Sequence, residues 1–233
     1  GCASSPAGTD GVRGSDLVTE SDEPALRKRA RLRLELAMGY FEQGQNTVAL
    51  DEIKQSLAID PNYADAYNVR SLIYMRLNDV RFAEESFQRA MALNPGDANI
   101  LHNYGSLLCQ QARYAEATDA FTRAIANPAY GGRAKTWMTQ GLCQVRAGKR
   151  TDAEYSLGKS FELDAGNPVT GYNLALLLYQ RSEFARSQFY IRRLNNSEQA
   201  NAETLWLGIK VEQRLNNRIA MEQLDSQLRS SFS

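Results

Sequence analysis

The residues of this 233-residue chain that could perform covalent or acid–base chemistry are three cysteines and one histidine. Cys2, Cys109 and Cys143 lie too far apart for a CxxC zinc or redox motif. His102 would need a nucleophile and an orienting third residue before it could act as a catalytic base. No phosphate-binding glycine loop and no HExxH motif occurs. The sequence therefore predicts a protein that is not an enzyme and that uses no cofactor, metal ion or small-molecule substrate.

Charge and hydropathy narrow the class of partner. The chain has 27 basic and 27 acidic residues, so its formal net charge is zero. A neutral balance gives no reason to expect nucleic acid as the partner. No stretch of 18 consecutive apolar residues is present to form a transmembrane helix. These features favour a protein partner.

The chain divides at Pro24. Residues 1–23 are rich in glycine and serine and hold few apolar residues. Such a segment cannot bury enough apolar surface to offset the entropy of ordering it, so we expect a flexible tether. From residue 24 to 233, apolar residues recur at helical spacing, and we expect a single helical domain.

An internal repeat of 34 residues runs through that domain. Pro61 and Pro95 are 34 residues apart, and two further sets recur at the same period: Ala49, Ala83 and Ala117, then Ile53, Phe87 and Phe121. This period, with small residues where two helices meet and large ones beside them, resembles the tetratricopeptide repeat. The fold class expected is all-α, a right-handed superhelical solenoid of six repeats. Their first residues lie near 30, 64, 98, 134, 168 and 201.

In that repeat class, four positions of the first helix of each pair face a concave groove. We expect these positions to form an apolar groove that binds a partner protein: Leu34, Met38, Phe41, Asn68, Leu72, Met75, His102, Met138, Leu142 and Tyr172. Leu34 and Met38 stand where relatives that clamp a carboxylate carry Lys and Asn, so such a clamp is not expected. The alternative is that these side chains pack on one another and leave no open groove.

The first residues, GCASSPAG, resemble the cleavage site of a bacterial lipoprotein. Such proteins are cut before a cysteine that is then acylated, and several acyl chains anchor a protein firmly. The resemblance implies lipid on Cys2, and Ala3 after it implies the outer membrane. A glycine left from cloning, next to an ordinary cysteine, is the alternative.

If Cys2 carries lipid, two cysteines remain for an oxidising compartment. Cys109 and Cys143 fall on the first helices of neighbouring repeats. A disulfide between them would close a loop of 34 residues, and chain entropy would then contribute about 3–4 kcal/mol. Two buried free thiols are the alternative.

Taken together, the cysteine, the tether and six repeats resemble the type IV pilus biogenesis lipoproteins that act as pilotins of the pilus secretin. The segments LAMGYFEQGQ, LHNYGSLLC and ANPAYGGRAKTWMTQGLC carry this resemblance. It implies a lipoprotein on the periplasmic face of the outer membrane. It also implies binding to secretin subunits and promotion of their localisation and multimerisation. A periplasmic scaffold for cell-wall synthesis or other envelope proteins is the alternative.

Overall fold

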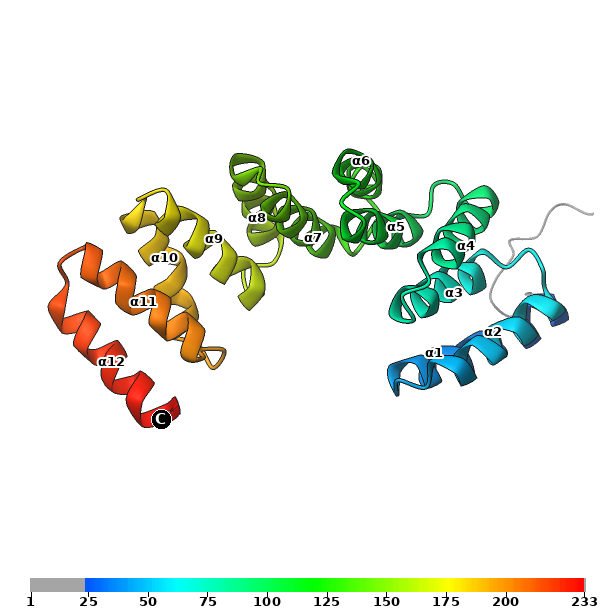
Figure 1. Ribbon diagram of the computed structural model, residues 1–233, viewed down its shortest axis with the longest axis horizontal. Coiled ribbons are helices and arrows are strands. Elements are labelled where there is room, and N and C mark those ends of the chain that lie inside the picture. Colours follow the sequence, from blue (N-terminus) through cyan, green and yellow to red (C-terminus); the bar gives the residue numbers. More distant parts are fainter. Residues whose placement is uncertain (1–23, 233) are drawn as a thin grey trace, which may run out of the picture.

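Residues 24–232 are described by the structure, a computed structural model, and within them the chain forms helices and no strand. The helices pair and stack side by side into an arc, with α1 and α2 at one end and α11 and α12 at the other (Figure 1). The predicted fold class, an all-α tetratricopeptide solenoid, is confirmed. Residues 1–23, which include Cys2, lie outside the described part of the chain.

Each repeat contributes an A helix and a B helix. The A helices are α1 (Ala25–Glu42), α3 (Ala64–Arg76), α5 (Ala98–Gln110), α7 (Arg133–Arg146), α9 (Pro168–Gln180) and α11 (Ala202–Arg214). The B helices are α2 (Asn46–Ile59), α4 (Val80–Leu93), α6 (Tyr114–Ile125), α8 (Arg150–Leu163), α10 (Phe184–Asn195) and α12 (Arg218–Phe232). Helix α1 begins before the predicted repeat start at Ala30, and the other A helices begin within one residue of the predicted positions.

The turn from each A helix to its B helix uses one residue in the left-handed backbone region. These residues are Gly44, Asn78, Ala112, Gly148, Ser182 and Asn216. Glycine and asparagine enter this region at little cost, whereas alanine and serine are disfavoured there. Because the turn recurs in every repeat, each B helix folds back on its A helix in the same way.

Small residues on one helix and large residues on the other form the seam inside each repeat. A Cβ atom added at Gly105 of α5 would lie 2.7 Å from Cε1 of Phe121 on α6, a side chain with no exposed surface. Gly141 stands in the same relation to Leu157, at 2.7 Å from its Cγ. The absent side chains therefore allow the two helices to approach closely.

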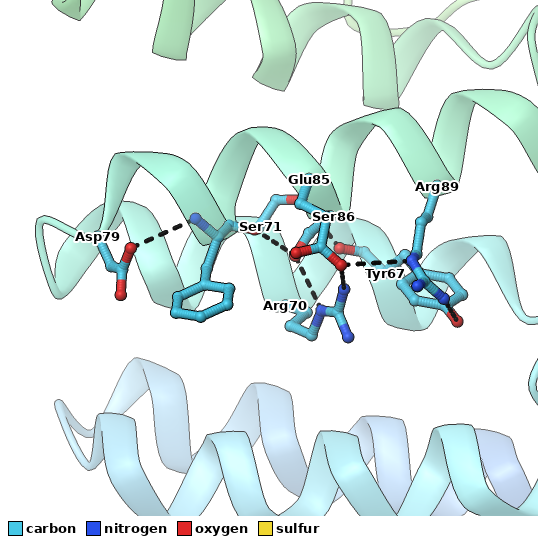
Figure 2. A network of polar contacts seen from close by, with 8 residues as sticks. Tyr67, Arg70, Ser71, Asp79, Glu85, Ser86 and Arg89 are labelled. Carbon is cyan, nitrogen blue, oxygen red and sulfur yellow. Dashed lines mark hydrogen bonds and ion pairs between the residues drawn. The ribbon is translucent and has the colours of Figure 1, made fainter.

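A polar network replaces part of the seam in the second repeat, where Arg70 occupies a position usually held by leucine. Its Nε donates a hydrogen bond to Ser86 Oγ at 2.8 Å, and its guanidinium lies 4.8 Å from the centre of the Tyr67 ring (Figure 2). The network extends to Glu85 and Arg89 on α4. The arginine is accommodated because its stem packs while its charged end finds polar partners.

A disulfide joins the third and fourth repeats. Cys109 of α5 and Cys143 of α7 are bonded, with their Cα atoms 6.0 Å apart. Both side chains are buried, beside Leu108 and Phe121. The bond therefore ties together two A helices across the boundary between repeats.

Two glycine substitutions should change stability in opposite directions. Gly105→Ala should lower the free energy of unfolding by about 1–3 kcal/mol, because the new methyl group cannot fit against Phe121. At Gly158 in α8, an added Cβ atom would have no neighbour within 4 Å. Gly158→Ala should therefore raise the free energy of unfolding by about 0.5–1 kcal/mol through helix propensity. Urea denaturation of both variants measures this, and equal effects of the two substitutions would contradict the seam described above.

Candidate functional site

The predicted site lies on the A helices, which face the inside of the arc. In the middle of the solenoid, α5 and α7 are on the inner side and α6 and α8 on the outer side (Figure 1). Neighbouring A helices also contact each other directly, α1 with α3, α3 with α5 and α5 with α7. Their inward side chains therefore form one continuous concave surface.

Leu34 does not belong to the open surface, which corrects the prediction. Its exposed fraction is 5%, and it packs in the core of the first repeat. Ala30, Leu34 and Ala37 recur at helical spacing and share the buried face of α1. Leu34 therefore supports the surface from below.

His102 is also buried, with an exposed fraction of 6%, and the prediction that it lines the groove is wrong. Its Nδ1 is hydrogen-bonded to Thr136 Oγ1 at 2.8 Å, and Thr136 Oγ1 is 3.0 Å from the Tyr130 hydroxyl oxygen. The imidazole ring also lies 5.9 Å from the ring centre of Phe121. Burial, with a smaller effect of Lys135, lowers the pKa of His102 to about 4. His102 is thus a neutral structural residue that joins α5 to α7.

Four of the predicted residues form what we call the apolar inner surface: Met38, Phe41, Leu72 and Met75. Met38 is exposed, at 45%, and the other three are half-buried. Phe41 packs on the first core and Met75 on the second. Phe41 and Met75 are therefore held by the cores while part of each side chain stays accessible.

Arg76, which the sequence interpretation overlooked, lies at the edge of this surface. Its guanidinium stacks on the Phe41 ring, 3.5 Å from the ring centre, and donates a hydrogen bond to the Phe41 carbonyl oxygen. An arginine that follows an apolar helical stripe is the only signal that could have indicated it. Arg76 fixes α3 against α1 and places one positive charge beside Phe41.

The remaining predicted groove residues lie on α3, α7 and α9 and are less exposed than Met38. Met138, Leu142 and Tyr172 are half-buried, and Met138 Sδ lies 3.3 Å from Asn167 Nδ2. Asn68 Oδ1 accepts a hydrogen bond from Asn103 Nδ2 at 3.2 Å, which links α3 to α5. Burial, together with Glu203, raises the pKa of Tyr172 to about 12. Met38 is therefore the most exposed apolar side chain among the predicted groove residues.

The described residues contain neither a candidate metal site nor a candidate membrane span. No cluster of three or more His, Cys, Asp or Glu side chains there is placed to hold a metal ion. None of the helices there combines the length and the apolar character needed to cross a bilayer.

This chain is similar in sequence to tetratricopeptide-repeat proteins and to a type IV pilus assembly protein. Tetratricopeptide-repeat models match residues 34–98 and 86–119. The type IV pilus assembly protein PilF of Pseudomonas aeruginosa is 28% identical over 207 residues, covering 86% of this chain and 82% of PilF. An uncharacterised protein of Haemophilus influenzae is 27% identical over 58% of this chain and 75% of its own length.

Solved structures agree with this similarity. The structure of P. aeruginosa PilF superposes with a TM-score of 0.79 at 27% identity, covering 88% of this chain and 93% of that one. The structure of PilW, described as a widely conserved type IV pilus biogenesis factor, superposes with a TM-score of 0.76 at 28% identity, covering 88% and 94%.

The pH dependence of stability should report the burial of His102. Its pKa is lower in the folded state, so the unfolded state binds the proton more readily. The contribution of His102 to the free energy of unfolding should therefore be fully present above about pH 6.5, and it should decrease as the pH drops towards 4. Between pH 7 and pH 4.5, protonation of His102 should cost the wild-type protein on the order of 2–3 kcal/mol in the free energy of unfolding. His102→Gln should abolish this part of the pH dependence. Urea unfolding of both proteins at pH 7 and pH 4.5 measures the difference, and parallel curves would show that His102 is already accessible to protons.

Proposed function

We propose that this chain, a tetratricopeptide-repeat protein homologous to the type IV pilus assembly proteins PilF and PilW, binds secretin subunits through its apolar inner surface. It would do so as a lipoprotein on the periplasmic face of the outer membrane, and would promote secretin localisation and multimerisation. The homology itself supports a role in pilus assembly. Secretin binding and membrane location are the parts that the proposal adds.

The exposure of Met38 on the helix whose buried face holds Leu34 is the observation that carries the proposal. Methionine adapts its shape to an incoming apolar segment, and a helix or strand of a partner can lie along such a groove. Phe41, Leu72 and Met75 extend this contact across the first two repeats. Because Phe41 and Met75 are packed against two cores, these two side chains would lose little entropy on binding.

Lipid on Cys2 would give the protein its location. Acyl chains partition into the bilayer at about 0.8 kcal/mol per buried CH₂, so several chains hold a protein firmly. Residues 3–23 would then separate the membrane from α1. A secretin subunit bound to the inner surface would travel with the lipid and be delivered to the same membrane.

Met38→Glu should abolish secretin binding, because a carboxylate in an apolar contact must be desolvated without a partner. The measurement is a pull-down from detergent extracts with wild-type and variant protein as bait. Leu36→Glu is the matched control, since Leu36 lies on the same helix with a similar exposure, 47% against 45% for Met38.

Each result of the pull-down is informative. Loss of secretin with Met38→Glu alone supports docking on the inner surface, and loss with Leu36→Glu alone would place the docking on another face of α1. If wild-type protein recovers cell-wall synthesis enzymes and no secretin, the scaffold function is correct and the secretin proposal is wrong.

Lipidation can be tested separately. Protein extracted from cell membranes should give an N-terminal peptide whose mass includes acyl chains on Cys2, and Cys2→Ser should move the protein from the outer-membrane fraction to the soluble fraction. Cys109→Ser is the control and should leave the acylated peptide unchanged. An unmodified Cys2 in membrane-derived protein would contradict the proposed anchor.

A further inference from the structure

A groove lies between the B helices of the fourth and fifth repeats. This α8–α10 groove has a volume of about 660 Å³. Its walls include Tyr155 and Gly158 of α8 and Tyr190 of α10, and its floor includes Leu174 and Leu177 of α9. It is separate from the apolar inner surface, which lies on A helices at the other end of the chain.

Gly158 keeps the groove open. It lies in the interior of α8, where glycine costs about 1 kcal/mol relative to alanine. A Cβ atom at this position would meet nothing within 4 Å, so close packing does not explain the glycine. The equivalent positions of α4 and α6 carry Gln88 and Thr122. The fourth repeat is therefore hollowed at a point where these neighbours carry a side chain.

Aromatic rings surround the groove and are unusually accessible. Tyr155 is 62% exposed and Phe189, beside the groove, is 58% exposed. Trp137 meets Tyr155 edge-on at 6.0 Å between ring centres, and Phe161 meets Tyr190 edge-on at 4.9 Å. Such rings supply apolar contact at low entropic cost and are enriched in binding sites.

The charge of the groove is positive although the chain as a whole is neutral. Its lining includes four cationic residues and two carboxylates: Arg150, Lys159, Arg181, Arg186, Glu154 and Glu162. Both oxygens of Glu154 accept hydrogen bonds from Arg181, at 2.9 Å each, and Arg186 lies 3.6 Å away from one of them. Arg181 also lies 3.3 Å from Glu183, and Lys159 lies 3.6 Å from Glu162. Three of the four cations are therefore ion-paired, and the excess positive charge is that of one residue.

Arg150 supplies that excess. It is the first residue of α8, where the helix dipole disfavours a cation, and no ion pair involves it within the described residues. Its position is unfavourable for the helix alone, but it places a positive charge at the end of the groove.

From these features we infer that the α8–α10 groove is a second protein-docking site, which takes an acidic peptide segment carrying an apolar side chain. The apolar side chain enters above Gly158 and contacts Tyr155 and Tyr190. Acidic residues beside it pair with Arg150, the cation of the groove that has no ion pair among the described residues. The positive charge of the groove favours a negatively charged partner. A small anion alone would leave the apolar floor without a contact, so the ligand must also carry an apolar side chain.

The test uses the folded protein and three short fluorescein-labelled peptides of known sequence. The first combines Asp and Glu with a central Phe-Leu pair, the second replaces the acidic residues by Lys, and the third replaces Phe-Leu by Ser-Ser. Fluorescence anisotropy should show saturable binding of the first peptide only. Gly158→Leu should abolish this binding by filling the groove, and Gly158→Ala should retain it.

Arg150→Glu should weaken binding about tenfold or more, since it places like charges together. Arg218→Glu is the matched control, because Arg218 is the first residue of α12 and gains the same dipole interaction away from the groove. Circular dichroism verifies that each variant is folded. Secretin pull-down by Gly158→Leu should be unchanged, which separates this inference from the proposed function.

Three results with the peptides would overturn the inference. They are the absence of saturable binding of the acidic peptide, equal binding of the Lys peptide, and binding that the Gly158→Leu and Arg150→Glu variants leave unchanged. Binding of phosphatidylglycerol vesicles without binding of the acidic peptide would assign the groove to a membrane surface and also overturn it.

Discussion

The close approach of the two helices within each repeat is the constraint on which the rest of this structure depends. At Gly105 and Gly141 even one added carbon would collide with a buried side chain of the facing helix. No single helix pair encloses its apolar face, so neighbouring repeats must complete each core. Residues such as Met38 are left at the surface because the buried face of α1 is already defined by Ala30, Leu34 and Ala37.

The fold could be predicted from the sequence because the repeat spacing acts through local geometry. Ala49, Ala83 and Ala117 are fully buried, as are Ile53, Phe87 and Phe121. The limits of prediction appear at single helix positions. Leu34 and His102 lie one step around the helix from the open face, and a difference of that size depends on how neighbouring repeats rotate against each other. A repeat pattern does not specify that rotation.

Long side chains were harder still to predict. The stacking of Arg76 on Phe41 joins residues 35 positions apart, and the polar partners of Arg70 come from a different helix. Such contacts depend on which neighbours are within reach in three dimensions. Gly158 could not be interpreted from the sequence either, because its distinguishing feature is the empty space around the position of its missing Cβ atom. The composition of the chain is neutral, and only the structure shows that Arg150, a cation without an ion pair in the described part of the chain, lies at the end of one groove.

The bond between Cys109 and Cys143 has a mechanical consequence. A pulling force between the two ends of the chain would pass through this bond, so the 34-residue segment that it closes could not be drawn out. At 3.3–3.6 Å per residue, about 110–120 Å of contour length would be withheld from extension. The junction of the third and fourth repeats would then survive loads that unravel the helices at both ends.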